Sequence, residues 1–213
     1  TIYGNGSIVG VIHLSPKLDL TTSWGGQLNA NYHNYYSAKD VLGYSQVQNG
    51  IAQKSNGTIG SWTNEDYLTF KHCKGPSILT MVAGASWYYT VNTNTFTGAE
   101  NFFDNYFSYN SLQTGTVYEQ PSSSRADSRF NSYYLRANYE YDGRWFLGSS
   151  LRVDGSSRFG VDNKYGYFPS VSAAWKISRE KFFEKFSDRI NSLKLRASFG
   201  SVGNAEIQNY SSL

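Results

Sequence analysis

Apolar and polar side chains alternate strictly along the C-terminal half of this chain. From residue 133 to 141, the odd positions carry Tyr, Leu or Ala, whereas the even positions include Arg136, Asn138 and Glu140. Successive side chains of a β-strand point to opposite faces of the sheet, so the pattern gives one apolar and one charged face. The same alternation recurs over residues 145–154, 170–177 and 192–199. The sequence therefore predicts strands whose two faces meet different surroundings.

The composition supports an all-β fold without catalytic or nucleic-acid-binding chemistry. Aromatic residues make up 17% of the chain and charged residues 16%, against about 25% charged in typical globular domains. A net charge of +3 without a run of Lys and Arg predicts no nucleic-acid partner. A single cysteine, Cys73, and three scattered histidines offer no metal-ligand spacing. We expect neither an enzyme nor a bound cofactor, and no segment resembles a signal peptide or a transmembrane helix.

Short and long connections alternate between the eight expected strands. Four further strands are expected over residues 7–14, 18–32, 62–72 and 78–90. Short turns fall at 15–17, 73–77 and 142–144, and long polar segments cover 33–61, 91–129 and 155–168. Outer-membrane barrels have short periplasmic turns and long extracellular loops, and strands of about ten residues cross the hydrocarbon layer. The pattern predicts an antiparallel, up-and-down transmembrane β-barrel segment.

Such a barrel turns its apolar face to lipid and its polar face to a wet interior. Five basic residues are then expected to face the lumen, namely Arg136, Arg152, Lys176, Lys194 and Arg196. Aromatic residues at both ends of the strand 133–141 suggest two interfacial girdles. They are Tyr139, Tyr141, Trp145 and Phe146 at one end and Phe130, Tyr133 and Tyr134 at the other. Simple cross-strand aromatic pairing is the alternative explanation for them.

One short helix interrupts the β pattern. Ser178 is placed to cap a helix from Arg179 to about Phe186, with Phe182, Phe183 and Phe186 as its apolar stripe. We expect it to lie at the periplasmic, short-turn end of the barrel. The spacing of Ser178 and Lys181 also matches the S-x-x-K motif of penicillin-binding enzymes, but its partner motifs are missing from the chain.

Four strings in the C-terminal third carry a family resemblance. They are RANYEYDGRWFLGSSLRVDGSSRFG over 136–160, NKYGYFPSVSAAWKIS over 163–178, EKFF over 180–183 and LKLRASFGSVGN over 193–204. In this order and spacing the chain resembles the SusC/RagA family of TonB-dependent outer-membrane transporters from Bacteroidetes.

The resemblance implies a place and a function for the chain. Residues 1–213 would be part of a larger TonB-dependent receptor barrel, without the plug domain, in the bacterial outer membrane. The parent protein would import oligosaccharides or peptides, energised through TonB, with a SusD-like surface lipoprotein as its partner and outer-membrane lipid around it.

Aromatic residues in polar loops are the expected ligand contacts, since a ring can stack on a sugar face while neighbouring polar groups bind hydroxyls. Tyr106, Phe107 and Tyr109 are the strongest candidates, with Trp62 as a fourth. The alternative is that these rings pack the loop onto its neighbours or onto the lipoprotein.

Three other protein classes compete with this interpretation. A secreted carbohydrate-binding β-sandwich would share the aromatic composition, but its loops would lie at both ends of the sheet. A self-contained eight-stranded barrel would not need such long loops. A TonB-dependent siderophore or cobalamin transporter would share the fold but is expected to lack the DGSSRFG and YGYFPS strings.

Overall fold

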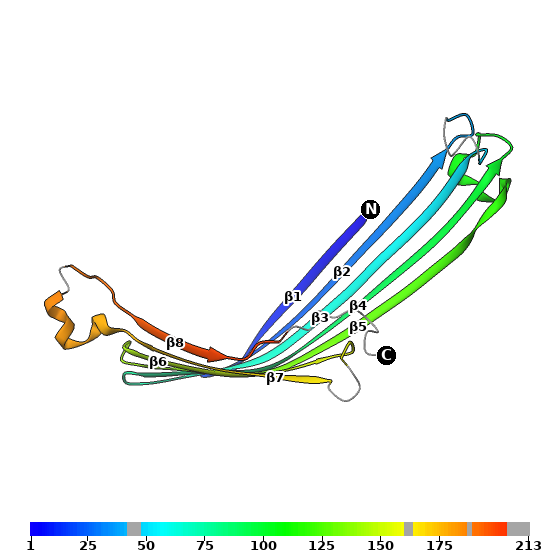
Figure 1. The fold of residues 1–213 in the computed structure, drawn as a ribbon. Helices are drawn as coiled ribbons and strands as arrows, with labels where there is room; N and C mark the ends of the chain where they lie inside the picture. The colour runs from blue at the N-terminus through cyan, green and yellow to red at the C-terminus, as the bar shows by residue number, and fades with distance from the viewer. Residues whose placement is uncertain (42–47, 160–163, 187–188, 204–213) are drawn as a thin grey trace. The chain divides into compact units, whose positions relative to one another are not determined.

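The computed structural model describes residues 1–41, 48–159, 164–186 and 189–203. Within these residues eight strands form one sheet, and each strand is hydrogen-bonded to the next strand in the chain (Figure 1). The described strands include no second sheet packed on the first, so the β-sandwich is excluded. None of the helices in the described ranges has the length and apolar character needed to cross a membrane.

The strands vary from 6 to 27 residues in length. Short 3₁₀ helices occur in two of the connections: η1 (Ser108–Asn110) and η2 (Leu112–Thr114) precede β5, and η3 (Ile177–Arg179) and η4 (Lys181–Phe186) follow β7. The strands are β1 (Ile2–Ser15), β2 (Leu18–Ser37), β3 (Ile51–Lys74), β4 (Ser77–Phe102), β5 (Gly115–Tyr141), β6 (Trp145–Ser156), β7 (Tyr165–Trp175) and β8 (Leu195–Gly200).

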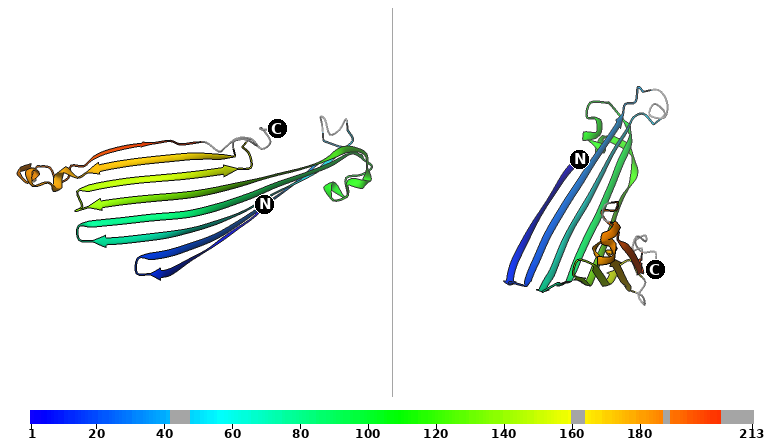
Figure 2. Two further views of the ribbon diagram at one scale, coloured as in Figure 1. Left: turned by 90° about the horizontal axis from the view of Figure 1, so that it is seen from below. Right: turned by 90° about the vertical axis from the view of Figure 1, so that its left-hand side faces the viewer.

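The chain divides into two compact units. Unit 1 comprises Thr1–Gly6, Gly26–Trp62 and Thr90–Asp127; unit 2 comprises Ser7–Gly25, Thr63–Tyr89 and Ser128–Leu213. Unit 2 holds the short turns that join β1 to β2, β3 to β4 and β5 to β6, and all three lie at the same end of its strands (Figure 2). This arrangement agrees with the short-turn end expected from the sequence.

The register of β5 to β8 in unit 2 keeps odd residues opposite odd residues. Leu135 pairs with Leu151, and Leu151 pairs in turn with Pro169. Val171 pairs with Ser149 on one side and with Phe199 on the other. The strands therefore share one odd-numbered face and one even-numbered face, as the alternation predicts.

The apolar residues of the odd-numbered face do not converge on a dry core. Leu135, Leu151, Val171 and Leu195 are 47%, 45%, 57% and 62% exposed. An apolar sheet face of this extent needs an apolar environment that the described residues themselves do not supply. Of the seven aromatic residues predicted for the two girdles, Phe130, Tyr134 and Phe146 lie on the even-numbered face and the other four on the odd-numbered face. The girdles themselves stay a prediction.

The hairpin between β5 and β6 has the geometry that its sequence demands. Asp142 and Gly143 both adopt positive φ, at 52° and 60°, and the Arg144 amide donates to the Tyr141 carbonyl at 3.0 Å. Two central residues with positive φ define a type I′ turn, for which Asp-Gly is a preferred pair. The predicted turn at 142–144 is confirmed, and the turn predicted at 73–77 is only Gly75 and Pro76.

The predicted long loops are much shorter than expected. Strand β2 continues to Ser37 and β3 begins at Ile51, while β4 runs to Phe102 and β5 begins at Gly115. The segments that were predicted as loops but form paired strands show little apolar alternation. Their backbone hydrogen bonds form without a buried apolar face, so the period that marks a half-buried strand is absent from the sequence.

The predicted helix from Arg179 to Phe186 is wrong in type and in its cap. The segment forms two short 3₁₀ helices, and Ser178 lies inside η3 instead of capping it. In a 3₁₀ helix residues i and i+3 are eclipsed, which places Phe183 and Phe186 against each other with ring centroids 5.8 Å apart. Phe182 lies instead 6.3 Å from the ring of Trp175. So short a segment has too few turns to repay α-helix nucleation.

Candidate functional site

The loop between β4 and β5 is fastened to the start of β3 in unit 1. The Phe102 amide donates to the Asn49 carbonyl at 3.0 Å, and Asn49 Nδ2 donates to Asn101 Oδ1 at 3.0 Å and to the Phe102 carbonyl at 3.2 Å. Asn49 and Asn101 adopt positive φ, at 54° and 59°. Asparagine tolerates this conformation better than most residues, and its side chain can satisfy the local backbone groups.

A small hydrophobic cluster supports the same loop. Phe102 is only 2% exposed and packs with Ala52 and Ala99. Three partly buried residues complete the cluster, namely Tyr36, Tyr109 and Leu112. The base of the loop is therefore an ordered structure that can hold side chains in fixed positions.

Hydrogen bonds from Tyr36 and Lys39 connect this cluster to the loop between β4 and β5. Tyr36 Oη donates to Asn105 Oδ1 at 2.7 Å, and Lys39 Nζ donates to the Phe103 carbonyl at 2.8 Å. Burial raises the pKa of Tyr36, and the charges of Asp40 and Asp104 raise it further. The neutral phenol is thus the form that the folded loop accommodates.

The four predicted ligand contacts fall into different environments. Tyr106 is 84% exposed and Phe107 48% exposed, and their rings meet edge to face at 5.0 Å. Tyr109 instead packs against the cluster, with Lys54 Nζ 5.8 Å from its ring centroid. Trp62 lies in β3 rather than in the loop, and it is 43% exposed.

Phe103, which was not among the residues predicted to contact a ligand, is 89% exposed at the start of the same loop. The sequence contains a hint of this exposure. Phe103 follows Phe102 in a polar segment, and only one of two adjacent rings can enter the cluster. Phe103, Tyr106 and Phe107 are thus all exposed in one short segment on a supported base, and this segment is called here the aromatic loop.

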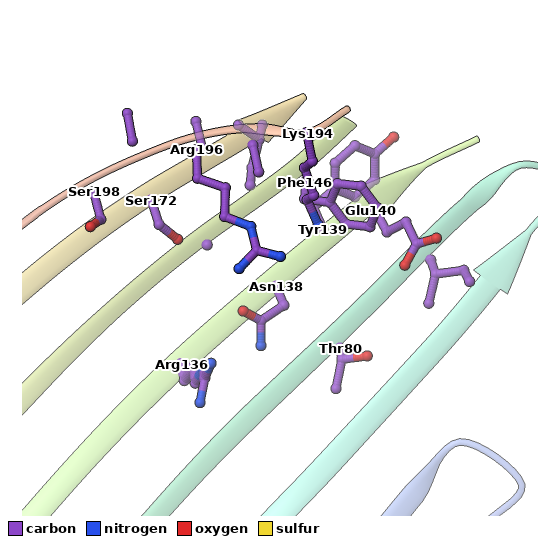
Figure 3. A pocket seen from close by; sticks show the side chains of 16 residues that line it. Thr80, Arg136, Asn138, Tyr139, Glu140, Phe146, Ser172, Lys194, Arg196 and Ser198 are labelled. Carbon is purple, nitrogen blue, oxygen red and sulfur yellow. The ribbon is translucent and has the colours of Figure 1, made fainter. Parts of the chain in front are cut away.

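A second candidate site lies on the even-numbered face of unit 2. It is an open pocket of about 630 Å³ (Figure 3). Small residues make room for it: a Cβ on Gly148 would lie 2.6 Å from Ser172 Oγ. Its charged lining consists of Arg136, Glu140, Lys194 and Arg196.

The pocket has an excess of positive charge. The Arg196 side chain extends over the strands towards Asn138 and Arg136 (Figure 3). Lys194 Nζ lies 3.7 Å from the ring centroid of Phe146, a cation–π contact. Three cationic side chains thus share the pocket with one carboxylate.

Two of the five predicted lumen-facing residues are not in this pocket. Arg152 Nε donates to both carboxylate oxygens of Asp154, at 2.7 and 3.0 Å, and Arg152 Nη2 donates to the fully buried Ser132. Lys176 follows the end of β7, where its amide donates to the Arg144 carbonyl at 2.8 Å. The structure therefore groups Arg136, Lys194 and Arg196 and leaves Arg152 and Lys176 elsewhere.

A cluster at the short-turn end joins the 3₁₀ segment to the sheet. Glu180 accepts a hydrogen bond from Arg144 Nη1 at 3.0 Å and another from Trp175 Nε1 at 2.9 Å. The rings of Trp145 and Trp175 stack in parallel at 5.2 Å. These contacts position η4 at the end of β6 and β7.

No group of three or more His, Cys, Asp or Glu side chains in the described ranges could hold a metal ion. His13 Nδ1 lies 2.6 Å from an Asp19 carboxylate oxygen, and both side chains are open to solvent. Cys73 is free and exposed. What the two candidate sites do present is exposed rings at the first and charged side chains at the second.

Comparison with known proteins places the chain in a family. Residues 7–212 match the family described as "TonB dependent receptor-like, beta-barrel". The chain belongs to this family of outer-membrane receptors and transporters, and its open sheet is part of a transmembrane barrel wall.

Individual relatives show how similar the chain is to known proteins and how much of each it covers. TonB-dependent receptor P3 of Formosa agariphila is 39% identical over 150 residues, which cover 70% of this chain and 15% of that protein. TonB-dependent receptor SusC of Bacteroides thetaiotaomicron is 42% identical over 76 residues, covering 36% of this chain and 8% of SusC. The solved RagAB peptide transporter aligns with 97% of this chain and 23% of its own, with a TM-score of 0.85 and 22% identity. The chain thus spans less than a quarter of each protein.

Proposed function

We propose that this chain forms part of the wall and extracellular loops of an importer that carries oligosaccharides or peptides across the outer membrane. A SusD-like surface lipoprotein acts with it, and TonB supplies the energy through parts of the parent protein outside residues 1–213. The family membership and the likeness to SusC and to the RagAB peptide transporter support this proposal.

One observation carries the assignment of ligand contact to this chain. The aromatic loop presents Phe103, Tyr106 and Phe107 to solvent on a base that is packed and hydrogen-bonded. The rings of Tyr106 and Phe107 touch each other, and exposed rings outside the hydrophobic cluster contribute little to the described fold. Such rings offer flat apolar surface to a sugar face or to a peptide side chain, and the supported base lowers the entropy lost on binding.

The two sheet faces have different surroundings in this proposal. The odd-numbered face meets lipid, because an Arg or Lys turned to the bilayer midplane costs about 2–4 kcal/mol. The even-numbered face then borders the interior, so Arg136, Lys194 and Arg196 give the pocket of Figure 3 a positive potential towards the transport path. An anionic group on a substrate or on another part of the parent protein would be favoured there.

The test uses the full-length parent protein with Tyr106→Ala and Phe107→Ala combined. Tyr32→Ala is the matched control, since Tyr32 is a 58% exposed tyrosine on β2 outside the loop. Losing two stacking rings is expected to weaken binding about 10-fold or more, at about 1 kcal/mol per aromatic contact.

Binding is measured by titrating purified protein with the oligosaccharide or peptide mixture on which the source cells grow, and uptake is measured in cells. Equal affinity and uptake for the double variant, the control and the wild type would remove the aromatic loop from the recognition surface. Uptake that continues without TonB would contradict the proposed energy source.

A further inference from the structure

The segment between β7 and β8 carries an exposed aromatic ring at the short-turn end of unit 2. It contains η3 and η4 and extends beyond the ends of the strands (orange in Figure 1). Phe182 in η4 is 58% exposed, whereas the next residue, Phe183, is only 6% exposed. Successive residues of a 3₁₀ helix are about 120° apart, because the helix has about 3 residues per turn. The two adjacent rings therefore face different surroundings.

The ring of Phe182 lies against the odd-numbered face of the sheet. Its centroid is 6.3 Å from that of Trp175, and Trp175 in turn stacks on Trp145 with 3° between the ring planes. Trp145 pairs with Tyr141 on one side and with Trp175 on the other, so these three residues form one row of the odd-numbered face. Phe182 thus continues this aromatic row past the end of the sheet.

Hydrogen bonds hold the segment in this position. The Glu180 carboxylate accepts from Arg144 Nη1 at 3.0 Å and from Trp175 Nε1 at 2.9 Å. The Glu180 amide donates to the Ile177 carbonyl at 2.9 Å, and the Phe183 amide donates to the Glu180 carbonyl at 2.9 Å. A ring on so constrained a backbone loses little conformational entropy when another molecule covers it.

The aromatic row does not lie at an open edge of the sheet. Strand β6 is hydrogen-bonded to β5 and β7, and β7 is hydrogen-bonded to β6 and β8. Any further strand of the barrel wall would pair with β1 or β8, the two edge strands of this sheet. The 45% exposure of Trp145 is therefore not caused by a missing neighbouring strand.

The aromatic row marks one edge of an apolar band. Trp145 precedes Gly155 by ten residues in β6, and Gly155 pairs with Tyr165, which is 52% exposed. Ten residues at about 3.4 Å each and a strand tilt of about 40° give a height of about 26 Å. The apolar band of transmembrane barrels is about 25 Å tall and has aromatic residues at both edges. Phe182 then lies at the membrane–water interface on the short-turn, periplasmic side.

The residues beside Phe182 indicate a shallow position for its ring. Lys181, Glu184 and Lys185 belong to the same short helix, and all three are exposed. The headgroup region of a bilayer accommodates apolar rings and charged groups together, whereas the hydrocarbon core and a dry protein contact do not. Phospholipid headgroups are therefore the occupant that fits this surface.

We propose that η4 is an interfacial anchor, in which Phe182 inserts among the phospholipid headgroups of the periplasmic leaflet on the outside of the barrel wall. Trp175 supports the ring from the sheet side, and Glu180 fixes the segment to the hairpin between β5 and β6. The anchor holds this end of β6 and β7 at a constant depth in the membrane. The inference rests on the proposed assignment of the odd-numbered face to lipid.

The test uses the full-length parent protein in phosphatidylcholine nanodiscs, with Cys73 and any other cysteine replaced by serine. A nitroxide label is attached to Phe182→Cys, and the matched control is a label on Glu184→Cys, an exposed position two residues further along the same short helix. Collisions of the label with oxygen, which concentrates in lipid, are compared with collisions with a nickel complex, which stays in water. The ratio of oxygen to nickel collisions should be several-fold higher at position 182 than at position 184.

A second variant keeps a ring at the site. Heat-modifiable gel mobility shows whether the labelled proteins are folded, and Phe182→Trp replaces them if they are not. Lipids brominated near the headgroup should quench the added tryptophan emission more than lipids brominated at the ends of the acyl chains.

Two results would overturn the proposal. A label at position 182 that meets the nickel complex as often as the label at 184 places the ring in water, and a label shielded from both reagents shows that another part of the parent protein covers it. A third label, on Leu151→Cys, tests the face separately. If oxygen does not reach that label, the assignment of the odd-numbered face to lipid has failed and the anchor fails with it. If the label at 151 lies in lipid and the label at 182 does not, only the anchor has failed.

Discussion

Substituting arginine on one face of strand β6 and then on the other tests which face meets lipid. Leu151 and Ser150 are adjacent in β6, so their side chains lie on opposite faces of the sheet. Leu151 pairs with Leu135 and is 45% exposed on the apolar side, whereas Ser150 Oγ lies 2.7 Å from Ser170 Oγ on the other side. Leu151→Arg and Ser150→Arg therefore carry the same chemical change into two environments.

The expected loss of unfolding free energy depends on how deep each substituted residue lies in the hydrocarbon layer. Leu151 is six residues from Trp145, at the start of β6, or about 20 Å of strand and about 15 Å of height at a tilt of about 40°. That height is the middle of a hydrocarbon layer about 30 Å thick. Leu151→Arg is then expected to lower the free energy of unfolding by about 2–4 kcal/mol. Ser150→Arg should cost only its hydrogen bond, about 0.5–1.5 kcal/mol.

The assay is reversible guanidinium unfolding of the full-length protein in phosphatidylcholine liposomes, followed by tryptophan fluorescence. The larger loss corresponds to a decrease of about 30-fold to several-hundred-fold in the ratio of folded to unfolded protein. Equal losses for the two variants, or a larger loss for Ser150→Arg, would refute the assignment of the odd-numbered face to lipid.

Three further changes test local features of the fold. Gly143→Ala and Gly75→Ala should each destabilise the barrel by roughly 1–2 kcal/mol, the cost of alanine at positive φ, because the new Cβ at 143 meets only the movable end of the Arg179 side chain and the one at 75 meets open space. Thermal unfolding of the two variants measures both losses, and a loss near zero for either would contradict the turn geometry. Glu180→Gln removes the ion pair that fastens η4 to the hairpin turn, so trypsin should cut the η4 segment faster, and an unchanged cleavage rate would deny that role. Tyr36 has a raised pKa in the folded loop, so its contribution is complete below its usual value of about 10 and is lost as the pH rises through the higher folded value; hydrogen exchange of the loop should increase there in the wild type but not in Tyr36→Phe.

The sequence predicted the parts of the sheet in which local pattern and environment agree. The alternation over residues 133–153 determined which side chains share a face, because a shift of one residue would have put Arg136 and Arg152 on the apolar side. Asp142-Gly143 determined a turn, since few residues accept two successive positive φ values. The family strings in the C-terminal third indicated the barrel class that the family match supports.

The candidate site was only partly predictable. Tyr106, Phe107 and Tyr109 have similar polar neighbours in the sequence, yet the first two are exposed and the third packs beside Phe102. That difference depends on Tyr36 and Ala52, which come from other strands and are brought together by long-range pairing. No local pattern contains such information.

By itself, the sequence determined the strands that have one apolar face, the tight turns between them and the family, because these depend on neighbours along the chain. The tertiary structure decided how far the strands extend beyond the apolar region, which rings are buried at the loop and which cations share a pocket. Arg136 and Arg196 lie 60 positions apart and meet in one pocket through the register of β5 to β8. Hydrogen-bond register across several strands is a collective property of the sheet, and this is why it cannot be read from any one segment.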